Sequence, residues 1–344
     1  MTKRIRLAAL AVAATAIPAV LAGCAASNGG GTSSNDNSIS IVGFSVLKTA
    51  NEPVIADFQK TDAGKDVKFT TSYGASGDQS RAVAGGLHAD EVHLSLEPDV
   101  ASLVSAGLVD KSWNKTPTQG ILTDSEVVFL VRKGNPLGIK SWDDLVKPGV
   151  KIITPNPASS GSAKWNILAA WAHAANAPGG NDAKATAFVT KILDNTVALP
   201  GSGSDALSSF VAGNGDVLLA YENDSIQARA AGDDVDYILP DDTLLIQNPV
   251  ALTTDATAPA SDFLKFQLSE AGQSDYAKAG FRPVIDGIKV DVPGANDPSN
   301  PFPAVKTQYT IDKDFGGWEK ANAEFFDDKT GIITKIISGL NLGS

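Results

Sequence analysis

Short apolar runs alternate with longer mixed segments along most of the chain, which predicts strands interleaved with helices. Val127–Val131 and Val217–Tyr221 are continuous apolar runs, typical of strands buried on both faces. An alternating apolar and polar segment begins near Ile39, and helices are expected at Asn51–Lys60 and Ala163–Ala175. The pattern predicts an α/β fold in which helices cover both faces of parallel sheets.

Further elements follow from the same reasoning. Strands are expected at Val67–Thr71, Val92–Leu96 and Lys151–Thr154, and helices at Val100–Ala106 and from Ser141 onward. Polar or Gly/Pro-rich breaks near 115–120 and 241–249 are candidate crossings between two lobes. We therefore expect one lobe from residues 39–120 plus 247–344, a second lobe from residues 121–246, and the two crossings side by side as a hinge.

The N-terminus does not follow the pattern of the folded part. Basic residues at Lys3, Arg4 and Arg6 precede an uncharged apolar stretch, Leu7–Ala22, which is short for a membrane span. The stretch ends in Leu-Ala-Gly and Cys24, which resembles a bacterial lipobox. We expect residues 1–23 to be a signal peptide.

Cys24 is then the expected lipidation site, and residues 24–38, which are small, polar and Gly-rich, are the expected flexible linker to a membrane. Because Cys24 is the only cysteine, the chain can form no intramolecular disulfide and has no cysteine cluster for a metal. No cofactor or metal is expected.

The formal net charge is −11, and this balance excludes a nucleic-acid partner, which would need clustered Lys and Arg. With 43% apolar residues the chain can bury a sizeable core.

Three segments share the order strand, Ser/Gly turn, helix: residues 71–79, 154–165 and 199–206. At each helix start, free backbone N–H groups and the positive end of the helix dipole would face one space. None of the three has the spacing of a nucleotide-binding glycine loop. The turns therefore favour a site for a small, dense oxyanion.

The central turn carries a resemblance to a known family. Ile153–Asn166 reads ITPNPASSGSAKWN and resembles the ITPNPKSSGGARWN segment of the prokaryotic sulfate-binding protein family, the solute receptors of sulfate/thiosulfate ABC importers. Further blocks match in register: Val128–Pro136, Lys147–Val150, Gly215–Asn223, Thr310–Asp312 and Phe315–Trp318. The likeness implies a two-lobed, type II periplasmic-binding-protein-like fold with a ligand cleft between the lobes.

In that family a dehydrated sulfate is held by neutral donors. Position by position, the resemblance implicates Ser45, Ser76, Gly77, Ser160, Gly161, Ser162, Gly203 and Tyr221. Ser76 and Ser160 would donate hydroxyls, whereas Ser45, Gly77, Gly161 and Ser162 would donate backbone N–H groups. The implied function is capture of sulfate by lobe closure and its delivery to a membrane permease, by a monomer tethered through Cys24.

Several positions depart from the family pattern. Tyr221 stands where Trp is common, Ala158 replaces Lys, Lys164 replaces Arg, and the third turn lacks the family's arginine. A phenolic hydroxyl can accept as well as donate, unlike an indole N–H. Asp78 and Asp205 lie close in sequence to the expected donors, and we expect both to point away from the ligand.

Other functions stay open at this stage. A receptor for thiosulfate, molybdate, tungstate or phosphate would use the same donors, and a surface adhesin would need none of them. A Ser-dependent hydrolase is less well supported, because no Gly-x-Ser-x-Gly elbow occurs. His88, His93 and His173 lack metal or catalytic spacing and are interpreted as structural or solvated, with His173 on an exposed helix face.

Overall fold

The computed structural model describes residues 37–340. The expected signal peptide, Cys24 and all but the end of the linker lie outside these residues. No helix between residues 37 and 340 combines the length and the apolar character that a membrane crossing requires.

The described strands form one sheet with the order β2-β1-β3-β9-β4-β7-β5-β6, while β10 pairs with β9 and β8 pairs with β4. Their bounds are β1 Ser38–Phe44, β2 Lys68–Gly74, β3 Glu91–His93, β4 Ile121–Arg132, β5 Ile152–Ile153, β6 Thr196–Ala198, β7 Val217–Tyr221, β8 Val235–Ile238, β9 Asp242–Leu252 and β10 Thr307–Tyr309.

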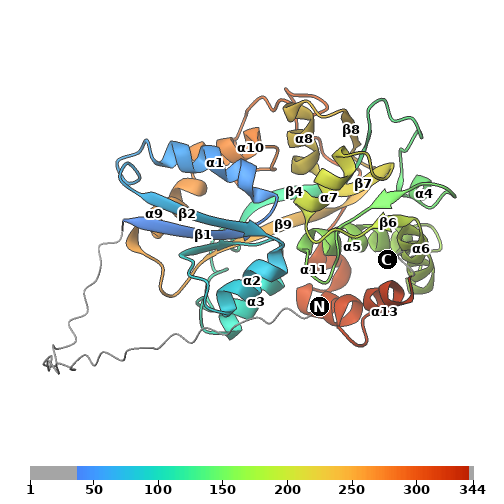
Figure 1. Cartoon of the computed structure of the whole chain (residues 1–344), viewed down its shortest axis with the longest axis horizontal. Helices are drawn as coiled ribbons and strands as arrows, with labels where there is room; N and C mark the ends of the chain where they lie inside the picture. The colour runs from blue at the N-terminus through green and yellow to red at the C-terminus, as the bar shows by residue number, and fades with distance from the viewer. Residues whose placement is uncertain (1–36, 341–344) are drawn as a thin grey trace, which may run out of the picture. The chain divides into compact units, whose positions relative to one another are not determined.

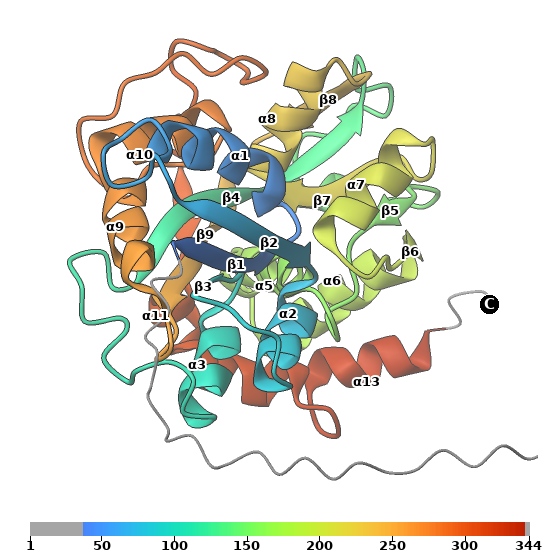
Figure 2. The ribbon, with the colours of Figure 1, turned by 60° about the vertical axis from the view of Figure 1, so that its left-hand side comes forward.

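Helices cover both faces of this sheet (Figures 1 and 2). Next to β1 and β2, helices α1, α9 and α10 lie on one face and α2 and α3 on the other; next to β7, α8 lies opposite α5. The helices are α1 Leu47–Phe58, α2 Ser76–Ala84, α3 Glu97–Ser105, α4 Trp142–Leu145, α5 Gly161–Asn176, α6 Asp182–Asp194, α7 Gly203–Val211, α8 Glu222–Ala231, α9 Ala258–Gln267, α10 Glu270–Lys278, α11 Ile311–Phe315, α12 Trp318–Ala321 and α13 Ile332–Gly339, with a π-helical turn at Asn322–Phe326.

The α/β class is confirmed, but the sheet is mixed, whereas the sequence pattern predicted parallel sheets. β1 runs parallel to β2 and β3, and β5 runs parallel to β6 and β7. The two long strands β4 and β9 run antiparallel to each other. β4 is also antiparallel to β7 and β8, whereas β9 is antiparallel to β3 and parallel to β10. They join the two parallel groups into one sheet, and the segment near 241–249 is therefore part of a strand and not a break.

The first helix begins earlier than the sequence pattern predicts. α1 starts at Leu47 and contains Pro53, instead of starting at Asn51. Asn51 does not cap the helix, because its side chain is buried and exchanges hydrogen bonds with the Tyr73 and Tyr276 hydroxyls at 3.1 and 2.7 Å.

The C-terminal segment packs against α5 through aromatic pairs. Trp165 lies edge-to-face with Trp318 at a centroid distance of 4.8 Å, and Trp171 with Phe325 at 4.7 Å. Trp318 is buried and is preceded by a turn in which Gly316 and Gly317 have positive φ. The Phe-Gly-Gly-Trp block therefore serves packing and a turn, and it holds α5, which carries the central Ser/Gly turn.

Candidate functional site

The three Ser/Gly turns meet at one place. The Gly77 N–H donates to the Ser159 carbonyl at 3.2 Å, which joins the first turn to the second. The Ser159 hydroxyl donates to the Gly201 carbonyl at 2.7 Å, which joins the second turn to the third. The Ser204 N–H lies 3.4 Å from the Ser45 hydroxyl oxygen, so the end of β1 reaches the same place.

The topology explains this convergence. β1 and β2 are parallel neighbours, so the residues that follow both strands, including Ser45 and Ser76, meet at one edge of the sheet. β5 and β6 are also parallel neighbours, and the turns that follow them lead into α5 and α7. The first residues of α2, α5 and α7 are thereby directed to a common region.

Five of the eight expected residues carry a backbone N–H that makes no hydrogen bond within residues 37–340: Ser45, Ser76, Gly161, Ser162 and Gly203. Four of the five occupy the first turn of a helix, where N–H groups have no intrahelical acceptor. Ser76, Ser162 and Gly203 are nevertheless buried. Buried donors without acceptors are costly, so this group of N–H donors has the character of an anion site.

Two glycines of the site are closely surrounded, and at Gly161 a side chain would not fit without a shift of its neighbours. A Cβ on Gly161 would lie 2.4 Å from the Ser95 hydroxyl oxygen and 2.8 Å from Leu96 Cγ. A Cβ on Gly203 would lie 3.0 Å from Val46 Cγ2. Glycine at these helix starts therefore permits the close approach of the turns to one another.

The two serine hydroxyls expected to donate differ in their partners. Ser160 is a buried residue, and its hydroxyl makes no hydrogen bond in the described part of the chain. The Ser76 hydroxyl, in contrast, donates to the Asp99 carboxylate at 2.5 Å and accepts the Ser95 N–H at 2.9 Å. At residue 76 the backbone N–H is free and the hydroxyl is not, while at Gly77 the N–H is already bonded to Ser159.

Tyr221 ends β7 and is fully buried, with its hydroxyl 2.7 Å from the Ser95 hydroxyl. Burial raises the pKa of the Tyr221 phenol well above its ordinary value, and hydrogen bonding to Ser95 lowers it in part. The phenol therefore keeps its proton throughout the physiological range.

Ser95 is the site residue that sequence reasoning missed. Besides Ser76 and Tyr221, it contacts the Trp165 indole N–H and the Asn248 amide, which donate to its carbonyl at 3.1 and 3.2 Å. The sequence feature that could have indicated Ser95 is its position as a polar residue within the strand-like segment Val92–Leu96. β3 ends at His93, so Ser95 leaves the sheet and enters the site.

The charged groups around the site have protein partners of their own, some of them charged and others neutral. Asp78 pairs with Arg81, and Asp205 accepts a hydrogen bond from the Ser202 hydroxyl at 2.7 Å. Burial raises the pKa of the Asp99 carboxyl, and the hydrogen bond from the Ser76 hydroxyl opposes part of this rise. Burial likewise lowers the pKa of Lys164, whose ammonium donates to the Asn322 side chain at 3.0 Å.

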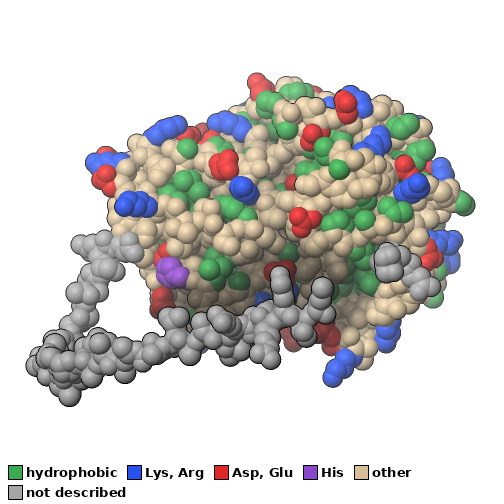
Figure 3. Space-filling model, viewed as in Figure 1, with side chains coloured by type: hydrophobic (Ala, Val, Ile, Leu, Met, Phe, Trp, Pro, Cys, Tyr) green, Lys and Arg blue, Asp and Glu red, His purple; other side chains and the backbone are tan. Residues whose placement is uncertain are grey.

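A cavity of about 380 Å³ opens beside these turns. Its lining comes from the end of β1, the start of α1, the first turn and the third turn: Ser45, Lys48, Tyr73, Gly74, Ala75, Asp78, Gly201, Ser202, Ser204 and Asp205. On the face shown in Figure 3, basic and acidic side chains are scattered and form no single-sign patch. The lining itself carries charges of both signs, from Lys48, Asp78 and Asp205.

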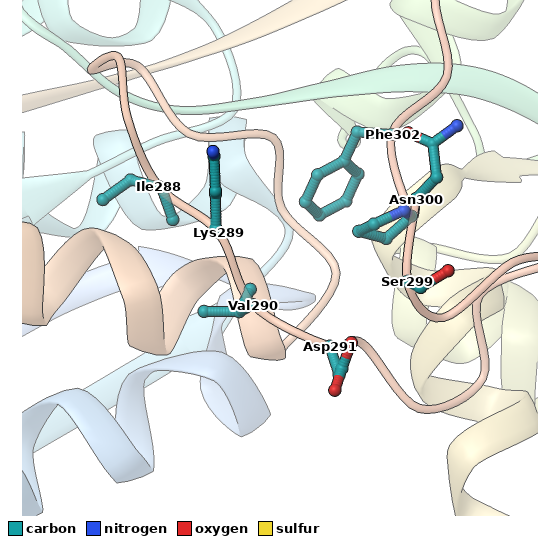
Figure 4. Close-up of a pocket in the computed structure, with 8 residues that line it drawn as sticks. Ile288, Lys289, Val290, Asp291, Ser299, Asn300 and Phe302 are labelled. Atoms are coloured by element: carbon teal, nitrogen blue, oxygen red, sulfur yellow. The ribbon is translucent and has the colours of Figure 1, made fainter.

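A larger cavity, of about 520 Å³, lies within the long loop after α10. Figure 4 shows Ile288 and Val290 on one arm of this loop and Asn300 and Phe302 on the other. It contains none of the expected site residues, and no helix start opens into it. Size alone therefore does not identify the site.

The histidines do not form a catalytic or metal-binding group. His93 is fully buried, with Nε2 3.3 Å from the Thr123 hydroxyl, and His88 lies 3.5 Å from Asp90. The expectation of an exposed face for His173 is wrong, because its side chain is mostly buried and Nδ1 lies 2.7 Å from Asp242. Residues 37–340 contain no cluster of His, Cys, Asp or Glu suited to a metal ion.

Comparison with known proteins agrees with this architecture. Residues 39–282 match the family described as bacterial extracellular solute-binding protein. A sulfate-binding protein of Synechococcus elongatus is 40% identical over 92% of both chains, and a thiosulfate-binding protein of Pseudomonas aeruginosa is 31% identical over 83% of this chain and 87% of its own.

A solved structure, the sulfate-binding protein SubI from Mycobacterium tuberculosis, superposes with a TM-score of 0.78 at 42% identity, over 84% of this chain and 99% of that one. Fold, family model and full-length relatives thus agree. The chain belongs to the bacterial extracellular solute-binding proteins and, within them, to the sulfate-binding protein family.

Proposed function

We propose that this protein captures sulfate outside the cytoplasm for an ABC importer. The observation that carries the proposal is the group of five backbone N–H donors, from Ser45, Ser76, Gly161, Ser162 and Gly203, that lack acceptors within the described residues. A tetrahedral dianion supplies acceptor oxygens to all of them at once. The names of the most similar relatives, sulfate-binding proteins, support the same ligand.

The site selects by hydrogen-bond type. Sulfate carries no proton near neutral pH and needs only donors, whereas phosphate keeps a proton that requires an acceptor. An unpaired polar group in a closed site costs about 1–3 kcal/mol, which is enough for strong discrimination. Asp78 and Asp205 line the cavity beside the turns, but their carboxylates are engaged with Arg81 and Ser202, and in our proposal they do not contact the anion.

The mechanism is binding without covalent chemistry. Donors from residues 39–120 plus 247–344 and from residues 121–246 would bridge the anion, and their joint contacts would favour a closed arrangement of two lobes. The closed form would dock on a membrane permease as a monomer. Lipidation at Cys24 would tether the protein to the membrane after removal of residues 1–23.

Calorimetric titration of the purified protein against sulfate, thiosulfate, molybdate and phosphate tests the proposal. We expect sulfate to bind with the lowest Kd and phosphate with the highest. Thiosulfate is the second candidate, favoured by the thiosulfate-binding relative. A protein that binds none of the four anions, or that prefers phosphate, would contradict the proposal.

The Ser160→Ala variant tests a buried serine whose hydroxyl makes no hydrogen bond within residues 37–340. We expect its sulfate Kd to rise about tenfold or more, because a hydrogen bond to a charged acceptor contributes about 1.5–3 kcal/mol. Ser208→Ala, at an exposed position of α7, is the matched control and should leave the Kd unchanged. Equal Kd values for the two variants would remove Ser160 from the site.

A further inference from the structure

We infer that Ser95 is a specificity-determining residue of the anion site that acts through Tyr221, by donating its hydroxyl hydrogen to the phenolic oxygen. This inference rests on the proposed function. The two hydroxyl oxygens lie 2.7 Å apart, and both side chains are buried. A hydrogen bond between them has two possible directions, and the direction determines what Tyr221 presents to a ligand.

The position of the pair places it at the anion site. The Ser95 hydroxyl oxygen lies 2.4 Å from the place of a Cβ on Gly161, whose backbone N–H is one of the free donors. The Ser95 N–H is held by the Ser76 hydroxyl at 2.9 Å, and Ser76 also carries a free backbone N–H. Ser95 is therefore fixed between two of the donor-bearing turns.

The surroundings hold Ser95 in place on every side. Its carbonyl accepts from the Trp165 indole and the Asn248 amide, and its N–H is used by Ser76, so only the hydroxyl keeps rotational freedom. The Asn248 carbonyl oxygen already accepts from Thr123 at 3.3 Å. The hydroxyl hydrogens of Ser95 and Tyr221 are therefore the groups that can reorient, and the Asn248 side chain is a further hydrogen-bond partner of the phenol.

A bound dianion decides the direction. Hydrogen bonds to an ionised acceptor are about twice as strong as bonds between neutral groups, so the phenolic hydrogen goes to the anion. The Ser95 hydroxyl then donates to the phenolic oxygen and occupies its acceptor capacity. Because burial keeps the phenol protonated, Tyr221 becomes a group that only donates.

This arrangement accounts for a departure from the family pattern. An indole, common in the family at position 221, donates and cannot accept. A tyrosine alone would offer a lone pair to a protonated anion and weaken discrimination against phosphate. The Ser95–Tyr221 pair reproduces the donor-only behaviour of the indole.

The test measures Kd for sulfate and for the singly protonated phosphate dianion, at a pH above neutral, in the wild type, Ser95→Ala, Tyr221→Phe and the double variant. We expect Ser95→Ala to lower the ratio of phosphate Kd to sulfate Kd about tenfold. In the Tyr221→Phe background, the same change at Ser95 should leave the ratio unchanged.

Tyr221→Trp provides a second, independent variant. Because an indole has no lone pair to offer, it should restore the wild-type ratio in the Ser95→Ala background. A purely structural role for Ser95 would raise both Kd values by one factor, and that result would overturn the inference. So would a change of the ratio that persists in the Tyr221→Phe background.

The measurements distinguish failure of the proposed function from failure of the role of Ser95. A wild-type protein that does not bind sulfate refutes the proposed function itself. A wild-type protein that binds sulfate, with a ratio that Ser95→Ala leaves unaltered, refutes only the role of Ser95.

Discussion

The Gly161→Ala variant should lose sulfate affinity by about 100-fold. The added methyl would lie 2.4 Å from the Ser95 hydroxyl oxygen and 2.7 Å from its Cβ, separations that real Cβ atoms essentially never show. Ser95 cannot move aside easily, because its N–H and carbonyl are held by Ser76, Trp165 and Asn248. The start of α5 must shift instead, and overpacking of this kind costs about 1–3 kcal/mol.

The shift would displace two free N–H donors together, those of Gly161 and Ser162. Calorimetry with sulfate measures the loss. Gly201→Ala is the matched control in the third turn, because its nearest neighbour would lie at an ordinary 3.7 Å, and it should bind like the wild type. If Gly161→Ala bound sulfate as tightly as Gly201→Ala, the start of α5 would not be part of the site.

The Glu126→Gln variant should be more stable than the wild type at about pH 8 and equally stable at about pH 4.5. Glu126 is fully buried on β4, where one carboxylate oxygen accepts from Gln308 at 2.5 Å and the other has no partner in the described residues. Burial raises its pKa from 4.5 to about 7, with Arg282 opposing the shift and Glu222 adding to it. Burial and the charge of Glu126 raise the pKa of nearby Asp124 to about 7 as well.

The direction of this pH dependence follows from proton binding by Glu126. The folded protein holds the Glu126 proton more tightly than the unfolded chain does, so the stabilisation is complete below pH 4.5 and is lost as pH rises through about 7. Glutamine keeps the shape and the bond to Gln308 but never ionises. We expect a difference of about 2–3 kcal/mol in the free energy of unfolding at the higher pH.

Urea unfolding of both proteins at the two pH values checks this expectation. Glu319→Gln, at an exposed position of α12, is the control and should leave the pH dependence as in the wild type. A Glu126→Gln variant that is less stable than the wild type at both pH values would mean that the ionised carboxylate, paired with Arg282, stabilises the fold.

Much of the fold was predictable because burial leaves a direct mark on the sequence. The apolar run Val127–Val131 lies within β4, and the run Val217–Tyr221 forms β7. Both runs are buried. Element boundaries were less predictable. Asn51 has the residue type of a helix cap, but it is a buried partner of Tyr73 and Tyr276, which are distant in sequence.

The candidate site shows the same division. The eight residues came from a motif resemblance, and the structure brings their turns together. Their hydrogen-bonding states could not be predicted, because they depend on neighbours from other segments. The Ser76 hydroxyl is committed to Asp99, and the Gly77 N–H to Ser159.

The sequence alone determined the alternation of strands and helices, the three Ser/Gly helix starts and the family to which they are similar, because periodicity and local motifs are properties of consecutive residues. The tertiary structure alone decided which donors stay free, that β4 and β9 join two parallel groups, and that Ser95 stands between Ser76 and Tyr221. The physical reason is that hydrogen-bond satisfaction and burial are set by contacts between segments far apart in the chain, and local sequence carries almost no record of them.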